Sequence, residues 1–140
     1  MTSVSELRCD ESCRYTTTSE WVRPLDAGKA VVGLTDYAQD QLSDIVYVEM
    51  PEIGDTFGQK EPFAIAESVK ATSDCYLPVG GEITAINEEL EGSPQLVNED
   101  PYGEGWFVEI AMSDPAELDD LMDAKAYRAF VAEELAKGED

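Results

Sequence analysis

The sequence contains a series of short strand-like segments, most of them ended by glycine or proline. This pattern limits its fold more than any other feature. The segments are rich in β-branched and aromatic residues, and several alternate apolar with polar side chains, as half-buried strands do. In 45–50, for example, Val46 and Val48 alternate with Tyr47 and Glu49. The pattern predicts a mainly β protein, an antiparallel sandwich or flattened barrel. The expected strands are residues 15–22, 30–34, 45–50, 82–87 and 105–110, with further short apolar segments at 75–79 and at the start of 62–74.

Helix-start signals occur in two regions. Thr35 is expected to cap a short helix that extends to about residue 42, because a threonine hydroxyl can accept from a free N–H group of the first turn. Near the C-terminus, Asp114 precedes a proline at the first helical position and a glutamate three residues on from the cap. Asp123 is expected to cap a second segment that ends at Gly138. We therefore expect helices at the C-terminal end.

The chain of 140 residues has the length of one domain, and that length can bury a core without disulfide or metal support. We expect residues 15–140 to form a single domain that includes C-terminal helices from about residue 115. Residues 1–14 are expected to be a flexible N-terminal tail and lack the apolar centre of a secretory signal. No apolar run approaches the roughly 20 residues that a membrane span needs. The expected location is cytoplasmic.

The formal net charge is −22, from 9 basic and 31 acidic residues, whereas a magnitude of about 2–8 is usual for a small domain. Such a surface argues against a nucleic-acid partner, which would need clustered lysine and arginine. Two explanations of the charge stay open. It can favour solubility and electropositive partner surfaces, or it can be an adaptation to a salty cytoplasm, where screening relieves the repulsion.

The three cysteines are Cys9, Cys13 and Cys75, and their odd number does not indicate a disulfide framework. They are expected to be free thiols in a reducing compartment. The chain has no histidine, so a zinc site would lack ligands at a known spacing, and no metal is expected. The commonest acid–base residue is also missing, and no nucleophile or phosphate-loop motif is present. The sequence therefore predicts a protein that is not an enzyme.

Lys70 lies where the segment 62–74 changes from apolar to polar, which predicts the tip of a β-hairpin. The basic residue nearest to it in the sequence is Lys60. A lysine at a hairpin tip extends its amine into solvent on a flexible stem. Such a lysine can simply promote solubility. It can also present one amine to a modifying enzyme, or carry a group on a long arm.

Three parts of the sequence resemble one family, the glycine cleavage system H proteins. Residues 67–71, Glu-Ser-Val-Lys-Ala, are similar to the family's lipoylation motif. Residues 35–51, with Thr-Asp-Tyr-Ala-Gln and Asp-Ile-Val-Tyr-Val-Glu-Met-Pro, resemble the segment that precedes its hairpin. Residues 96–106, Leu-Val-Asn-Glu-Asp-Pro-Tyr-Gly-Glu-Gly-Trp, resemble the segment that follows. The resemblance extends from about Tyr15 to about Phe130 in the family's order.

The resemblance implies two antiparallel sheets of the lipoyl/biotinyl-carrier hybrid type, with a lipoyl group in amide linkage on Lys70. It implies a lipoyl-carrying shuttle of the glycine cleavage system, which takes the aminomethyl group of glycine from the decarboxylase, or P-protein, to the aminomethyltransferase, or T-protein. The dihydrolipoyl dehydrogenase, or L-protein, and a lipoate-attaching enzyme are the other implied partners. A monomer without membrane or nucleic-acid partners is expected.

The resemblance also assigns roles to four further residues. Thr18, Glu20 and Asp74 match positions that line a cleft for the aminomethyl-loaded arm, and a hydroxyl and carboxylates suit an ammonium group. Either carboxylate could instead be a solvated loop acid. Glu67 matches a position that helps the lipoate-attaching enzyme recognise the hairpin, or it is simply an outward-facing strand residue.

Two departures from the family pattern stand out: Ser19 replaces the usual histidine, and Gly80 stands where serine is frequent. Ser19 affects the expected shape of the cleft or the docking of partners, and it leaves the attachment lysine unchanged.

Two alternative functions remain beside that of the glycine cleavage carrier. One is an H-like lipoyl carrier in lipoate relay or sulfur metabolism, and the other is a non-carrier interaction module of the same fold. A biotin carrier fits less well, because biotinyl lysines usually lie between methionines.

Overall fold

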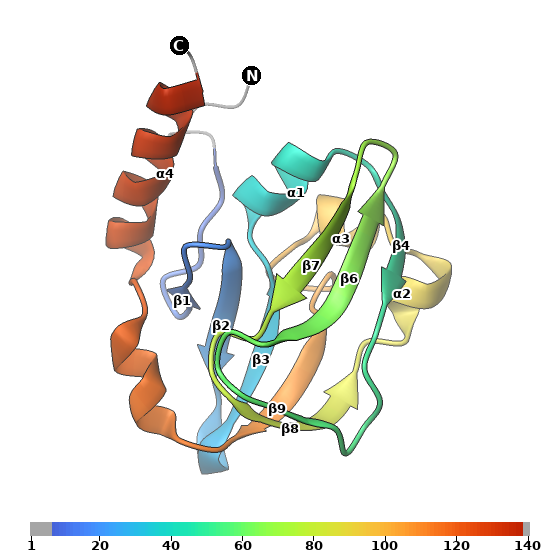
Figure 1. Cartoon of the computed structure of the whole chain (residues 1–140), viewed down its shortest axis with the longest axis vertical. Coiled ribbons are helices and arrows are strands. Elements are labelled where there is room, and N and C mark those ends of the chain that lie inside the picture. Colours follow the sequence, from blue (N-terminus) through green and yellow to red (C-terminus); the bar gives the residue numbers. More distant parts are fainter. Residues whose placement is uncertain (1–6, 139–140) are drawn as a thin grey trace.

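The computed structural model describes residues 7–138, which form two antiparallel β-sheets with the long C-terminal helix along one side (Figure 1). This confirms the predicted mainly β sandwich. The larger sheet has the order β1 (Arg14–Tyr15), β2 (Glu20–Pro24), β3 (Lys29–Leu34), β9 (Val108–Met112), β8 (Gly81–Ile86) and β5 (Thr56–Phe57). The smaller sheet has the order β4 (Ile45–Glu49), β6 (Pro62–Ser68) and β7 (Thr72–Tyr76).

The main hydrophobic core lies between the two sheets, because each sheet turns one apolar face toward the other. Its buried members come from both layers and are at most 6% exposed. Removal of their apolar surface from water is the main favourable term in folding. Representative core residues are Val32, Phe107, Val108 and Ile110 of the larger sheet and its flank, and Val48, Phe63, Ala66 and Cys75 of the smaller sheet.

The predicted helix starts are confirmed by their caps. Thr35 Oγ1 accepts from Ala38 N at 3.1 Å at the start of α1 (Asp36–Leu42). Asp114 caps a 3₁₀ helix, η3 (Pro115–Asp120), and Asp123 accepts from Ala126 N at 2.8 Å at the start of α4 (Ala124–Gly138). The connection 88–100 contains two short helices, α2 (Glu89–Gly92) and α3 (Leu96–Glu99). A further 3₁₀ turn, η2 (Asp26–Gly28), joins β2 to β3.

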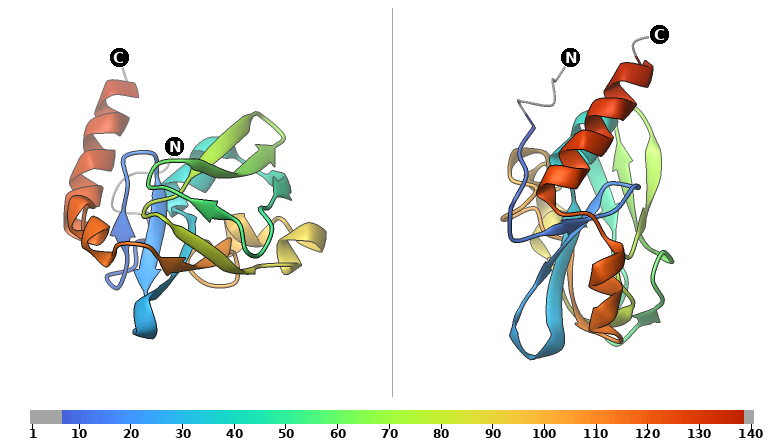
Figure 2. Two further views of the ribbon diagram at one scale, coloured as in Figure 1. Left: turned by 60° about the horizontal axis from the view of Figure 1, so that its bottom comes forward. Right: turned by 90° about the vertical axis from the view of Figure 1, so that its left-hand side faces the viewer.

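Residues 7–14 do not form the flexible tail that the sequence predicts. They run beside α4 (Figure 2). Their side chains join a second apolar cluster with Tyr15, Trp21 and Tyr127. Leu7 and Cys13 are buried in it, and Tyr15 stacks on Tyr127 with ring centroids 4.7 Å apart. The contacts are made with residues far along the chain, so local composition could not reveal them. The rest of the expected tail, residues 1–6, lies outside the described residues.

The expected first strand, 15–22, is divided by a turn at residues 16–19. Ser19 has φ 68° and its N–H donates to Thr16 O at 3.1 Å, so the chain reverses between β1 and β2. The expected last strand also begins later than residue 105, at Val108. The turn at 16–19 proves important, because it places threonine hydroxyls beside the next residue, Glu20.

The expected alternation in 45–50 is interrupted by a register shift between Ile45 and Tyr47. Val46 is therefore 53% exposed, and Ile45 and Val48 are buried instead. A β-bulge changes which face the following side chains occupy, and a residue pattern alone does not reveal it. None of the helices within 7–138 is long and apolar enough to cross a membrane.

Candidate functional site

The hairpin of β6 and β7 ends in a tight turn that Ser68 closes. Ser68 Oγ accepts from Lys70 N at 3.1 Å and from Ala71 N at 2.9 Å. Ser68 N also donates to Ala71 O at 2.8 Å. A side-chain oxygen that accepts from two nearby backbone donors stabilises the turn locally. The backbone at the tip is thus defined even though the tip faces solvent.

Lys70 lies at this exposed tip, where the sequence predicts it. Its Nζ donates to Gln41 O at 3.2 Å, at the C-terminal end of α1. The contact is solvent-exposed, and exposed polar contacts of a long side chain contribute little to stability. The amine can therefore leave this contact at small cost and remain available for acylation, which is what attachment of an acyl group requires.

A cavity of about 420 Å³ lies between the β1–β2 turn, the end of β7 and the segment that follows η3. Its charged residues are two acids, Glu20 and Asp120, and one base, Lys60. The other lining residues are Tyr15, Thr16, Thr17, Thr18, Tyr76, Leu77, Pro78, Leu121 and Met122. The lining thus combines apolar walls with several oxygen atoms, a composition suited to an alkyl chain that ends in a polar group.

Glu20 is the central polar group of this cavity and is only 1% exposed. Its Oε1 accepts from Thr16 Oγ1 at 2.8 Å and from Thr18 Oγ1. Its Oε2 accepts from Tyr76 N at 3.1 Å. Buried carboxyl groups need such partners because an unsatisfied one is costly. The threonine turn between β1 and β2 therefore serves as the support of this one carboxyl group.

Burial raises the pKa of Glu20 to about 7, while the hydrogen bonds from Thr18, Tyr76 and Thr16 lower it in part. At neutral pH the carboxyl group is consequently close to the midpoint between its two forms. A cation that enters the cavity favours the ionised form, since opposite charges attract strongly where water is excluded. The site is chemically suited to hold a primary ammonium group by a charge-assisted hydrogen bond.

The structure brings together two of the three residues expected in the cleft. Thr18 and Glu20 share the cavity, but Asp74 is exposed on β7 opposite Ile65 and is not part of the lining. Asp74 lies two positions from Tyr76, which does line the cavity, so both side chains leave β7 on the same face. Asp74 is thus a neighbour of the cavity and not one of its walls.

The sequence-based reasoning missed Thr16, Tyr76 and Asp120. The run of threonines at 16–18 was visible, but its meaning depends on the turn that folds it back on Glu20. No sequence signal connects Asp120, at the end of η3, with a strand a hundred residues earlier. Glu67, half-buried on β6, pairs with Tyr47 and Thr72 beside the hairpin tip and is not part of the cavity lining.

An exposed hairpin lysine on a two-sheet body, together with a separate cavity that holds a buried acid, defines a carrier protein, one that holds a prosthetic group on a lysine arm. Residues 13–134 match the family model described as glycine cleavage H-protein. The chain is 55% identical over 121 residues to the glycine cleavage system H protein of Aeromonas salmonicida, covering 86% of this chain and 94% of the relative. It is 52% identical over 123 residues to that of Halothermothrix orenii, covering 88% and 95%.

A solved structure supports the same assignment. The crystal structure of a glycine cleavage system H protein from Mycobacterium marinum superposes with a TM-score of 0.78 at 31% identity, covering 86% of this chain and 97% of that one. The chain belongs to the glycine cleavage H-protein family. H proteins are the non-catalytic lipoyl carriers of the glycine cleavage system, and membership implies the P-, T- and L-proteins of that system as partners.

Proposed function

We propose that Lys70 is the residue of this chain that carries the lipoyl group and that the Glu20 cavity receives the loaded arm. The observation that carries the proposal is the pairing of an exposed hairpin amine with a cavity whose buried carboxyl group has a pKa near 7. Attachment joins the carboxyl group of lipoate to Lys70 Nζ in an amide bond. In an ATP-dependent ligase, ATP is consumed to AMP and pyrophosphate, and the amine loses a proton.

The residues present fit this group. The tip of the hairpin is exposed, so an attached arm is not obstructed by packing around Lys70. The arm supplies a dithiol/disulfide pair that takes up the aminomethyl group of glycine and passes it on. A group tethered in this way reaches each docked partner at high effective concentration.

Glu20 holds the ammonium of the loaded arm, and Thr16 and Thr18 orient the carboxyl group through their hydroxyls. Tyr76 N fixes the second oxygen, so the carboxyl group cannot turn away from the cavity. Asp120, on the cavity wall, adds a second negative charge. Together these groups keep the loaded arm in a partly apolar site and limit its hydrolysis by water.

Asp74 contributes from outside the cavity, by adding negative charge beside Tyr76. Glu67 serves as a recognition residue for the lipoate-attaching enzyme, since it lies on the strand that leads to Lys70 and next to β4 in the same sheet. The protein acts as a cytoplasmic monomer that visits the P-, T- and L-proteins in turn, and residues 15–140 act as one domain.

Reconstitution with the P-protein tests this function directly. The chain, lipoylated in vitro, should support exchange of the glycine carboxyl group with labelled bicarbonate. A Lys70→Arg variant taken through the same lipoylation step should support none. Equal exchange by both proteins would show that the arm is carried elsewhere or is not needed.

A further inference from the structure

The hairpin that carries Lys70 is supported from one side by residues 43–45, the link between α1 and β4. Val69 N donates to Asp44 O at 3.0 Å, directly beside Lys70. Ile45 pairs with Ser68, the residue that closes the turn. The position of this link therefore helps to set the position of the tip, in addition to the contact of Lys70 with α1.

The backbone of this link is strained. Ser43 ends α1 with φ 71° and ψ −154°, a conformation that residues with a side chain adopt only when their surroundings hold it. Ser43 N donates to Gln39 O at 2.9 Å, and this hydrogen bond ties the start of the link to α1. The conformation of Ser43 also requires support at its carbonyl group and at the residues that follow.

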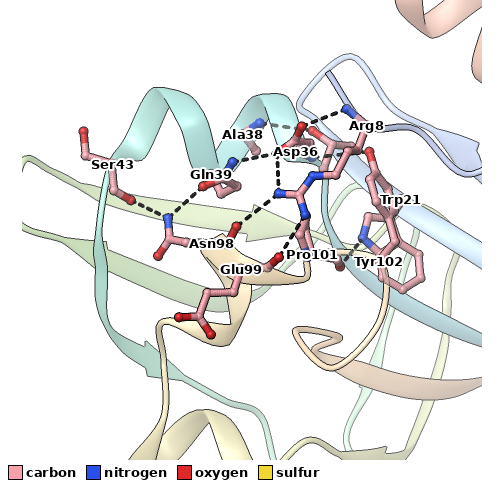
Figure 3. A network of polar contacts seen from close by, with 11 residues as sticks. Arg8, Trp21, Asp36, Ala38, Gln39, Ser43, Asn98, Glu99, Pro101 and Tyr102 are labelled. Carbon is pink, nitrogen blue, oxygen red and sulfur yellow. Dashed lines mark hydrogen bonds and ion pairs between the residues drawn. The ribbon is translucent and has the colours of Figure 1, made fainter. Parts of the chain in front are cut away.

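Asn98 of α3 supplies that support with both polar atoms of its side chain. Figure 3 shows the two hydrogen bonds that its Nδ2 donates. Its Nδ2 donates to Ser43 O at 2.9 Å and to Gln39 Oε1 at 2.8 Å. Its Oδ1 accepts from Ile45 N at 2.9 Å. One amide side chain thus holds the backbone on both sides of Asp44, whose carbonyl group receives the N–H of Val69.

Arg8 fixes Asn98 from the N-terminal segment (Figure 3). Its guanidinium group donates to Asn98 O at 3.2 Å and to Glu99 O at 2.9 Å, so it occupies carbonyl groups that a helix leaves free at its C-terminal end. The same group forms an ion pair with Asp36 at 3.0 Å. Asp36 in turn accepts from Gln39 Nε2 at 2.7 Å, which orients the Gln39 oxygen toward Asn98.

We propose that Asn98 is a positioning residue for Lys70. It acts through the 43–45 link, which it holds in the conformation that supports the hairpin tip, and it makes no contact with the lysine itself. The proposal rests on the proposed function in one respect, namely that Lys70 is the residue to be modified. If Asn98 acts in this way, the rate of lipoylation depends on a side chain in α3, outside the hairpin that the attaching enzyme recognises.

The test compares Asn98→Ala with Asn87→Ala, a matched control. Like Asn98, Asn87 makes three side-chain hydrogen bonds, with Glu104 O, Trp106 O and Glu89 N, although it is buried and Asn98 is only partly buried. None of these partners belongs to the hairpin or to residues 43–45. The two substitutions therefore remove similar contacts and differ in whether those contacts support Lys70.

Two measurements are made on the full chain. Hydrogen exchange at the Val69 amide should become about tenfold faster in Asn98→Ala, the size expected when hydrogen bonds to the link are lost, and stay unchanged in Asn87→Ala. With an ATP-dependent lipoate ligase, Asn98→Ala should lower kcat/KM by about tenfold, mainly through a higher KM, because fewer molecules present the turn in its bound form. Asn87→Ala should match the wild type.

Wild-type exchange at Val69 in Asn98→Ala would overturn the proposal. Equal slowing of lipoylation by both variants would also overturn it, because the effect would then reflect general loss of stability. If mass spectrometry shows that the wild-type chain is modified at a residue other than Lys70, the proposed function fails. The exchange result at Val69 then decides by itself whether Asn98 positions the hairpin.

Discussion

The Lys70 hairpin and the Glu20 cavity place an ionisable group in opposite environments, one exposed to water and one buried. Lys70 lies at an exposed tip with a solvent-accessible contact to a helix end, whereas Glu20 is 1% exposed and held by two hydroxyls and a backbone N–H. An amine that a modifying enzyme must reach has to be accessible. A carboxyl group that must hold a small cation acts more strongly where water is excluded.

The difference also separates the two regions in energetic terms. The hairpin tip depends on local hydrogen bonds of Ser68 and on the neighbouring link at 43–45. The cavity depends on tertiary packing of strands and of the segment after η3. Changes at the tip should therefore alter modification without altering stability, and changes in the cavity should alter stability and the retention of the loaded arm.

The largest expected effect is complete loss of lipoylation in Lys70→Arg. Arginine keeps the charge and the stem but cannot form the amide under these conditions. Because the side chain is exposed, the free energy of unfolding should change by less than about 0.5 kcal/mol. Mass spectrometry measures the loss of lipoylation, and thermal unfolding measures the change in stability. A large fall in Tm would contradict the placement of Lys70 at a free tip.

The next effect is on the pH dependence of stability. Burial raises the pKa of Glu20 from an ordinary value of 4.5 to about 7, so the folded chain binds this proton more tightly than the unfolded chain. The resulting stabilisation is complete below about pH 4.5 and is lost as the pH rises through 7. At 1.36 kcal/mol per pH unit, the amount lost is on the order of 3 kcal/mol.

Glu20→Gln should remove this loss, because glutamine cannot ionise. Relative to the wild type, the variant should gain stability between pH 5 and pH 8 in urea unfolding experiments. The control is Glu67→Gln, at a half-exposed carboxyl group of the hairpin, which should keep the wild-type slope. Parallel pH profiles for the wild type and Glu20→Gln would show that Glu20 is not the group that titrates.

A somewhat smaller effect is expected on retention of the loaded arm. Hydrogen bonds to charged groups contribute about 1.5–3 kcal/mol, so Glu20→Gln should shorten the half-life of the aminomethyl-loaded protein by roughly 10- to 100-fold. The half-life is followed by release of ammonia or formaldehyde after separation from the P-protein. An unchanged half-life would remove Glu20 from the role proposed for it.

The smallest effect is expected for Asp74→Asn. This carboxyl group is exposed and lies outside the cavity lining, and a solvent-screened charge contributes under about 1 kcal/mol. The half-life of the loaded arm should fall by less than about fivefold. A loss as large as that of Glu20→Gln would mean that the arm leaves the cavity and contacts β7 directly.

The local signals of the sequence predicted local structure well. The caps at Thr35, Asp114 and Asp123 act within one turn of the chain, so residue types alone identify them. The hairpin around Lys70 is equally local. The bulge at Val46 and the division of the first expected strand depend on register and on the positive φ of Ser19, which a residue pattern does not fix.

The candidate site was predicted in part, for a similar reason. The exposed position of Lys70 could be predicted because its hairpin is continuous in sequence, whereas its role as the attachment residue was inferred from the family resemblance. Glu20 and Thr18 were expected from the family resemblance, but the contribution of Tyr76 and Asp120 arises only when β7 and η3 are brought to the β1–β2 turn. The packing of residues 7–14 likewise depends on distant partners, such as the ion pair of Arg8 with Asp36.

The most direct test of the central claim is peptide mapping by mass spectrometry on the chain purified from its native source under lipoate-replete conditions. We expect one lipoyl adduct, located on Lys70, and none on Lys60, the lysine nearest to it in the sequence. A chain without an adduct, or with the adduct on another lysine, would contradict the assignment of Lys70 as the carrier residue.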